Sequence, residues 1–156
     1  MIEIQEIVRS KVMIRIATKT DVISIAEMAV LMWDSNSVEE LVREFETVLE
    51  NEESAVYIYC INNMPIGFAQ CGLRHDYVEG TESSPVGYLE GIFVQKGYRK
   101  KGYARELLAE CEKWSKGKGC SEFASDCELN NDVRLHFHMN LGFTEANRII
   151  CFTKHI

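Results

Sequence analysis

The most informative part of the sequence is Leu89-Glu-Gly-Ile-Phe-Val-Gln-Lys-Gly-Tyr-Arg-Lys-Lys-Gly-Tyr-Ala104. A β-rich run over residues 87–94 passes through a basic turn containing glycines and opens onto an amphipathic helix. The first N–H groups of a helix have no partner within it and carry partial positive charge. A glycine such as Gly102 lets a phosphate come close to the backbone. Further positive charge comes from Arg99, Lys100 and Lys101. The stretch therefore predicts a cradle for a pyrophosphate group.

Two common phosphate-binding loops do not fit this turn. Gly97 and Gly102 have the glycine spacing of a Walker A loop. That loop continues with a lysine and a hydroxyl residue, whereas this chain has Tyr103 and Ala104. The dinucleotide fingerprint G-x-G-x-x-G is absent. A solvated basic turn with a capping glycine is the alternative interpretation, but the position between a strand and a helix favours the phosphate cradle.

The sequence on both sides of this stretch predicts a mixed α/β domain in the order β-αα-βββ-α-β-α-β. Strands are expected at residues 12–17, 55–61, 66–73, 87–94, 122–126 and 149–153. Helices are expected at residues 22–32, 38–49, 104–117 and 131–141. Ser37, followed three residues later by Glu40, forms a capping box at the start of the second helix.

The length of 156 residues corresponds to one domain. The hydrophobic fraction of 46% and the charged fraction of 26% are those of an ordinary globular protein and exclude a disordered or coiled-coil chain. No apolar run approaches the ~20 residues needed to cross a membrane, and the first six residues predict no signal peptide. Because Met13-Ile-Arg-Ile-Ala itself resembles a protein start, we expect residues 1–12 to be an extension and residues 13–156 to be the domain.

Charge is distributed unevenly. The net charge is −7, which argues against general nucleic-acid binding. Residues 96–118 carry eight Lys or Arg against three Glu, whereas residues 34–53 carry eight carboxylates against one Arg. Two such segments would steer an anionic ligand and a polycation to different places. A solvated acidic helix face is the alternative for most of these carboxylates.

Six cysteines are present, and no two have C-x-x-C spacing. No histidine follows them at zinc-finger spacing, so no metal site is predicted. Several of them lie within apolar patterns, as Cys60, Cys71 and Cys111 do. We therefore expect free, mostly buried thiols in a reducing cytoplasm.

Nearly the whole sequence from Met13 onward resembles the GCN5-related N-acetyltransferase superfamily. Arg99-Lys-Lys-Gly102-Tyr-Ala104 matches the acetyl-CoA motif of that superfamily, and Asn131 with His138-Met-Asn-Leu-Gly142-Phe143 matches its later helix-to-strand motif. Further strings in the same order resemble the aminoglycoside 6′-N-acetyltransferases. These strings are Leu73-Arg-His-Asp-Tyr-Val-Glu-Gly80, Ser83-Ser-Pro-Val86, Leu89-Glu-Gly-Ile-Phe-Val94 and Glu122-Phe-Ala-Ser-Asp126.

The resemblance implies a mixed central sheet flanked by helices, with one central strand splayed from its neighbour and acetyl-CoA lying in the V-shaped gap. The pyrophosphate would rest on backbone amides of the turn, and the thioester carbonyl would face a backbone amide near the end of the strand. The implied acetyl-CoA contacts are Ile92, Phe93, Val94, Arg99, Lys100, Lys101, Gly102, Tyr103, Ala104 and Asn131. For Asn131, which would bond the pantetheine amides, helix capping is the alternative.

The acceptor of this family is a protonated amine, which must lose a proton before it attacks the thioester. Glu90 is the candidate base, since an unpaired charge in so apolar a strand would be costly; an exposed strand face is its alternative. The resemblance makes Asp126 a second carboxylate that holds a cationic amine, with a turn or helix cap as the alternative. Further candidates for acceptor binding are Asp76, Glu79 and Trp33, the last of which could equally belong to the core.

His138 occupies the position where many superfamily members have a tyrosine that protonates the leaving thiolate. A histidine can donate that proton, but a thiolate is a good leaving group and can depart without an acid. Cys127, next to Asp126, raises the alternative of an acetyl-cysteine route. Direct attack is favoured over that route, because the resemblance implies it and no histidine adjoins Cys127 in the sequence.

The expected activity is therefore acetyl-CoA-dependent acetylation of the 6′-amine of aminoglycosides, by direct transfer in a ternary complex, with antibiotic resistance as the outcome. The alternatives are the same chemistry on another amine, such as a polyamine, small metabolite or protein lysine, and a non-catalytic acyl-CoA sensor. We expect a cytoplasmic protein without nucleic-acid or membrane partners. A homodimer is also expected, because an exposed closing strand could pair with its copy.

Overall fold

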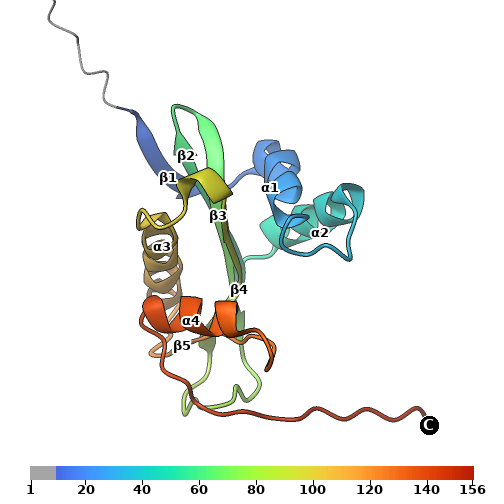
Figure 1. Cartoon of the computed structure of the whole chain (residues 1–156). Helices are drawn as coiled ribbons and strands as arrows, with labels where there is room; N and C mark the ends of the chain where they lie inside the picture. Colours follow the sequence, from blue (N-terminus) through green and yellow to red (C-terminus); the bar gives the residue numbers. More distant parts are fainter. Residues whose placement is uncertain (1–9) are drawn as a thin grey trace, which may run out of the picture.

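Five strands form one sheet in the order β1-β2-β3-β4-β5 in the computed structural model, which describes residues 10–156 (Figure 1). The strands are β1 (Val12–Ile16), β2 (Ser54–Ile61), β3 (Met64–Arg74), β4 (Val86–Val94) and β5 (Phe123–Ala124). Neighbours are antiparallel except for β4 and β5, which run parallel. The predicted mixed α/β class is confirmed.

Helices cover both faces of this sheet. They are α1 (Val22–Ala29), α2 (Val38–Glu50), α3 (Tyr103–Gly117) and α4 (Asp132–Asn140), with short 3₁₀ turns η1 (Lys19–Asp21) and η2 (Lys96–Tyr98). Figure 1 shows α1 and α2 on one face and α3 on the other, with α4 near β5. The capping box predicted for α2 is confirmed, because the Ser37 hydroxyl accepts from the Glu40 amide at 3.2 Å and the Glu40 carboxylate accepts from the Ser37 amide at 2.8 Å.

Alternating side chains of the strands build two cores. Val56 and Ile58 of β2 face α1 and α2, where they pack with Phe45 and Phe68. On the opposite face, Tyr59 belongs to the cluster that α3 covers. This period of two is the reason why a strand buried on both faces reads as a nearly continuous apolar run.

The splay expected in the middle of the sheet is present. β4 pairs with β5 only at Gly87↔Phe123 and Tyr88↔Ala124. The strand runs on to Val94, so its second half has a partner on the β3 side and an open edge on the other within residues 10–156. This open edge is where the candidate site lies.

The closing strand predicted at residues 149–153 is wrong. The residues after Phe143 form neither helix nor strand, and in Figure 1 they run away from the domain as an extended chain. Ile150 is 77% exposed and Phe152 is 90% exposed. The apolar run has β propensity, but β5 has only two paired residues and offers no ladder of useful length. β5 is also shorter than the predicted 122–126, because its ladder with β4 ends at the pair Tyr88↔Ala124.

The first strand begins one residue before the expected domain boundary at Met13, because Val12 already pairs with Ile61. Lys11 is also tied to the β2–β3 turn, where its amide donates to the Asn62 side chain at 2.9 Å. Residues 1–9, most of the expected extension, lie outside the described residues, so the division into extension and domain stays a prediction. Among the helices of residues 10–156, none is long and apolar enough to span a membrane.

We expect Gly87→Ala to destabilise the junction of β4, β5 and α3. A Cβ at Gly87 would lie 2.6 Å from Cβ of Ser115 and 2.6 Å from the Phe123 ring, both fixed by the packing around them. Overpacking of this kind lowers the free energy of unfolding by about 1–3 kcal/mol, which urea unfolding will measure. Gly117→Ala is the matched control, since nothing lies within 4 Å of its added Cβ. Equal midpoints for the two variants would contradict the prediction.

Candidate functional site

Glu90 is the extra residue of a β-bulge in β4. Leu89 pairs with Cys71 and Gly91 pairs with Gln70, so Glu90 has no opposite residue in the ladder with β3. A bulge bends the strand and turns the extra side chain out of the regular alternation. The sequence singled out Glu90 because it interrupts an apolar strand, and the bulge is the local structure that accommodates it.

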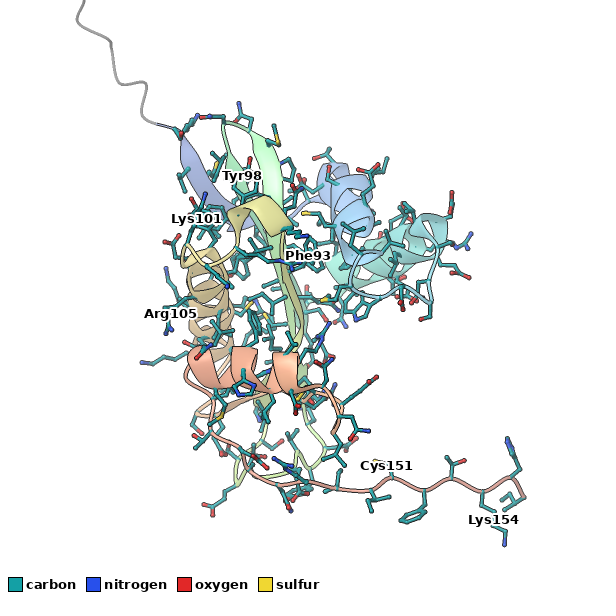
Figure 2. All side chains as sticks on the ribbon, in the orientation of Figure 1. Phe93, Tyr98, Lys101, Arg105, Cys151 and Lys154 are labelled. Atoms are coloured by element: carbon teal, nitrogen blue, oxygen red, sulfur yellow. The ribbon has the colours of Figure 1, made fainter. Side chains whose placement is uncertain are left out.

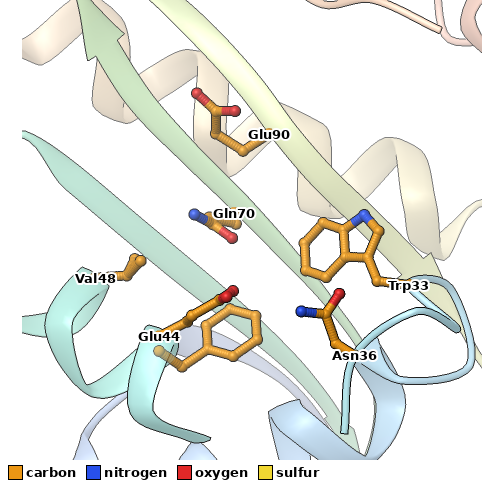
Figure 3. A pocket seen from close by; sticks show the side chains of 7 residues that line it. Trp33, Asn36, Glu44, Val48, Gln70 and Glu90 are labelled. Atoms are coloured by element: carbon orange, nitrogen blue, oxygen red, sulfur yellow. The ribbon is translucent and has the colours of Figure 1, made fainter. Parts of the chain in front are cut away.

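The Glu90 carboxylate faces a hollow of about 320 Å³ between β4 and α2 (Figure 3). The hollow is lined by Trp33, Asn36, Glu44, Phe45, Val48, Gln70 and Glu90. Trp33 also packs on Phe45, with ring centroids 6.3 Å apart, so it belongs to the core and to the hollow at once. The core interpretation of Trp33 is therefore confirmed, and its role in acceptor binding stays a prediction.

Glu44 is a second carboxylate of this hollow that the sequence analysis left among the solvated acidic residues of its helix. The spacing of Glu44 could have predicted this position. Glu44 follows Leu41 by three residues and precedes Val48 by four, which puts it on the apolar side of α2. A carboxylate at that helical position points toward the domain. Glu44 and Glu90 together give the hollow a negative lining.

Arg74 and Tyr88 connect Glu90 with Asp126. Arg74 Nη2 lies 3.1 Å from each oxygen of Glu90, and its guanidinium carbon lies 3.5 Å from the centroid of the Tyr88 ring. The Tyr88 hydroxyl donates to Asp126. Burial, followed by the bond to Asp126, raises the pKa of Tyr88, so this hydroxyl stays protonated near neutral pH. Glu90 and Asp126, both predicted from sequence, thus belong to one network, although Asp126 does not line the hollow.

The basic turn presents a row of backbone donors. In the described part of the chain, the N–H groups of residues 100–105 donate to no acceptor of the protein, and the first bonded amide of α3 is that of Glu106, which donates to Gly102 O at 3.1 Å. Lys100 at φ 60° and Gly102 at φ 88° are left-handed, so the chain turns sharply and its amides converge. A side chain added at Gly102 would meet nothing within 4 Å, which leaves the approach open.

The side chains of the turn divide their roles. Arg99 Nε donates to Val94 O at 2.8 Å, which fixes the turn against the end of β4. Tyr103 packs its ring against Tyr59 with centroids 4.7 Å apart, so it offers a ligand its amide rather than its phenol. Lys101 lies beside Tyr98 at the surface, above α3 in Figure 2. A second hollow of about 340 Å³ adjoins the turn and is lined by Leu31, Phe93, Gln95, Lys96, Gly97 and Arg99.

The open edge of β4 carries two more donors. Gln95 N–H donates to Ile66 O across the ladder with β3 at 2.8 Å. Because bonding directions alternate along an antiparallel strand, the N–H groups of Ile92 and Val94 point away from β3, toward the gap beyond β5. The predicted contact of a carbonyl oxygen with an amide near residues 92–94 thus has two suitably directed donors.

His138 lies on α4 beside the point where β4 and β5 separate. Its Nδ1 is 2.8 Å from Arg134 O, and because a carbonyl only accepts, this nitrogen carries a proton. Its Nε2 is 2.9 Å from the Ser125 hydroxyl, which is also 3.2 Å from Leu89 O. Ser125 is a residue that the sequence analysis missed, since only the fold brings it between the imidazole and β4.

Two predicted contact residues, Asn131 and Glu79, have other partners in the structure, and a third, Asp76, is exposed. Asn131 caps α4, because its side-chain oxygen accepts from the Arg134 amide at 3.0 Å, so the capping alternative is confirmed and its NH₂ group remains for a ligand. Glu79 accepts from the Asn147 side chain at 2.8 Å. Asp76 is exposed on the loop after β3. Neither Asp76 nor Glu79 is brought to the hollow that Glu90 lines.

This arrangement separates two kinds of recognition. A row of backbone donors and cationic side chains suits a pyrophosphate, and a carboxylate-lined hollow with an indole face suits a cation with a flat apolar side. The open edge of β4 lies between them with its own N–H donors. Such a site can hold an anionic cofactor and a cationic acceptor on the two sides of one strand.

Comparison with known proteins agrees with this geometry. The model of the Acetyltransferase (GNAT) family matches residues 24–143. Aminoglycoside N(6′)-acetyltransferase type 1 from Salmonella typhimurium is 38% identical over 123 residues, which cover 79% of this chain and 85% of that protein. The protein of the same name from Stenotrophomonas maltophilia is 40% identical over 141 residues, which cover 89% of this chain and 90% of that protein.

Solved structures show the same fold. Aminoglycoside N-acetyltransferase AAC(6′)-Iy in complex with CoA superposes with a TM-score of 0.90 at 35% identity, over 95% of this chain and 97% of that one. AAC(6′)-Iy in complex with the bisubstrate analogue CoA-S-monomethyl-acetylneamine superposes with a TM-score of 0.88 at 35% identity, over 94% of this chain and 100% of that one.

We expect Gly91→Ala to displace the indole that lines the Glu90 hollow. A Cβ at Gly91 would lie 2.8 Å from Cζ2 and 2.9 Å from Cη2 of Trp33. In a Trp114→Phe background, which leaves one tryptophan, the emission should shift to longer wavelength, and the free energy of unfolding should fall by about 1–3 kcal/mol. Gly117→Ala in the same background should leave the emission unchanged. An unshifted spectrum for Gly91→Ala would show that the indole does not rest on the strand.

Proposed function

The chain belongs to the Acetyltransferase (GNAT) family, and from this premise we propose that it acetylates the 6′-amine of aminoglycosides with acetyl-CoA. The observation that carries the choice of acceptor is the hollow lined by Glu44, Glu90 and Trp33. The relatives at 38% and 40% identity bear this activity in their names. Acetylation removes a positive charge that the drug needs to bind ribosomal RNA, so the outcome is resistance.

Acetyl-CoA fits the basic turn. Its pyrophosphate carries the negative charge that the N–H groups of residues 100–105 and the start of α3 can bind. Nothing lies within 4 Å of a Cβ added at Gly97 or Gly102, so the chain leaves room for phosphate oxygens at the backbone. Lys96 and Arg99 line the adjoining hollow and add charge there. When bound, acetyl-CoA supplies the activated acetyl group.

An aminoglycoside fits the acidic hollow. Its amines are protonated near neutral pH, and the carboxylates of Glu44 and Glu90 bind them with charge-assisted hydrogen bonds. The indole of Trp33 offers a flat face for a sugar ring. A volume of about 320 Å³ takes one amino-sugar ring, so the remaining rings would extend over the acidic surface of α2.

The residues around β4 divide the work of transfer. Glu90 takes the proton that the acceptor amine must lose. The amides of Ile92 and Val94 donate to the thioester oxygen and stabilise the negative charge that grows there. The hydroxyl of Ser125 connects His138 Nε2 with this edge of the strand. An imidazolium that carries a proton on both nitrogens would pass the Nε2 proton to the Ser125 oxygen while the Ser125 hydroxyl gives its own proton to the leaving sulfur, which leaves a neutral imidazole. The amine attacks directly while both substrates are bound.

We expect the purified protein to release thiol from acetyl-CoA with kanamycin A and not with paromomycin. Kanamycin A has an amine at the 6′ position, where paromomycin has a hydroxyl, so the pair isolates that group. Thiol release is followed with a chromogenic disulfide reagent, and spermidine is the third acceptor. Turnover with spermidine alone would replace the aminoglycoside by another amine. A protein that binds acetyl-CoA but releases no thiol with any of the three would favour a sensor.

We also propose that the protein is a homodimer in which the C-terminal segment of one copy contacts the other. Ile149, Ile150 and Phe152 are 59%, 77% and 90% exposed, which is costly for apolar side chains in water. The segment extends from the domain, as Cys151 and Lys154 in Figure 2 show. A second copy would cover these side chains and give the segment the strand partner that the described residues of its own copy lack.

We expect the double variant Ile150→Glu, Phe152→Glu to dissociate this dimer. Loss of two buried apolar side chains at about 1.5–3 kcal/mol each should raise the dimer dissociation constant more than tenfold in sedimentation equilibrium. Lys154→Ser, in the same segment, is the control and should leave the association unchanged. A wild-type protein that sediments as a monomer would contradict the proposal.

We further propose a cytoplasmic location, which the cysteines support. Cys60, Cys71, Cys111 and Cys120 are buried free thiols, whereas Cys127 is half-buried and Cys151 is exposed. Burial raises the pKa of Cys60 and so keeps its thiol protonated and unreactive. Free thiols of this number suit a reducing compartment.

A further inference from the structure

Arg74 binds the Glu90 carboxylate but does not itself line the hollow. It is the last residue of β3, and besides the two contacts of Nη2 its Nε lies 3.3 Å from Glu90 Oε1. The guanidinium therefore engages both carboxylate oxygens. On its other side it lies flat against the ring of Tyr88, which is itself only 6% exposed and fixed by its bond to Asp126.

We propose that Arg74 is an internal counter-ion that the ammonium group of the acceptor must displace from Glu90, and that it thereby lowers the affinity of every acceptor by one common factor. The inference rests on the proposed function, because it concerns the same acceptor site. Arg74 was not among the residues that the sequence analysis singled out for a role. It competes with the acceptor for the Glu90 carboxylate.

Displacement is feasible because the ion pair is only half-buried. The side chains of Arg74 and Glu90 are 44% and 34% exposed, and pairs with that much solvent contribute little net stability. The pair can therefore open without disturbing the sheet. The Tyr88 ring would keep the guanidinium close by after it leaves the carboxylate, through the cation–π contact that already exists.

The penalty does not depend on the charge of the amine. Every acceptor loses the same free energy when it opens the Arg74–Glu90 pair. A monoamine regains only one ionic contact, with Glu90, whereas a polycation also reaches Glu44 in the same hollow. The fixed penalty therefore lowers every affinity by one factor, and the advantage of a polycation comes from its second contact.

The test compares Arg74→Gln with the wild type by isothermal titration calorimetry against two probes. These are kanamycin A and 6-amino-6-deoxyglucose, a monoamine with the same reacting ring. We expect Arg74→Gln to lower the dissociation constant of both probes by about two- to fivefold, the upper part of the range of an exposed ion pair. The gain should be the same factor for both, because both displace one guanidinium. A gain that grows with ligand charge would indicate a long-range field instead and would overturn the proposal.

Two further variants complete the test. Arg43→Gln removes a positive charge next to Glu44 in the sequence without touching Glu90, and it should not tighten the monoamine. In a Glu90→Gln background, Arg74→Gln should change the affinity less than twofold, because the pair no longer exists. If the Gln variant unfolds, the measurement is repeated with Arg74→Met, whose apolar side chain can still pack on the Tyr88 ring.

The outcomes separate this inference from the proposed function. A wild-type protein that neither binds nor acetylates kanamycin A would refute the proposed function and the inference together. A wild-type protein that acetylates kanamycin A, with an Arg74→Gln variant that binds it equally or more weakly, would refute the inference alone. A gain that persists in the Glu90→Gln background would also refute it.

Discussion

The early end of the β4–β5 ladder is the constraint on which the rest of the site depends. After Tyr88 the two strands separate, and the backbone of β4 keeps an open edge as far as Val94. An unpaired strand edge is normally a liability. Here the bulge at Glu90 follows at once, so the same interruption directs two amides into the gap and a carboxylate toward α2. The donors and the candidate base therefore have a fixed relation to each other.

Close packing holds this interruption in place. Gly87 lets Ser115 and Phe123 approach the strand before the gap, and Gly91 lets Trp33 rest on it after the bulge. Ser125 connects Leu89 with His138 at the fork. The first half of β4 is thus tied to α3 and α4, and Trp33 packs on Gly91, whereas the edge as far as Val94 stays available to ligands. A rigid strand of this kind is suited to hold two substrates in register.

The separation of charge across the molecule follows from the same architecture. The basic segment forms the turn and α3 on one face of the sheet, and the acidic segment forms α2 on the other (Figure 1). An anionic cofactor and a cationic acceptor would approach from different sides and meet at β4. Arg74 is a cation on the acceptor side that pairs with the candidate base itself, and this pairing is what points to a competition with the acceptor.

Features that depend on local order could be predicted from the sequence: the period of two in the strands, the capping box at Ser37, the basic turn at Gly102 and the apolar strand around Glu90. Such features are set by residues a few positions apart. The tertiary structure alone decided that Glu44 shares a hollow with Glu90, that Arg74 pairs with Glu90 and that Ser125 lies between His138 and β4. These contacts join residues 13 to 46 positions apart, and they depend on strand register and on one bulge that no local pattern encodes. The segment at 149–153 failed as a strand for the same reason, since β propensity supplies no partner.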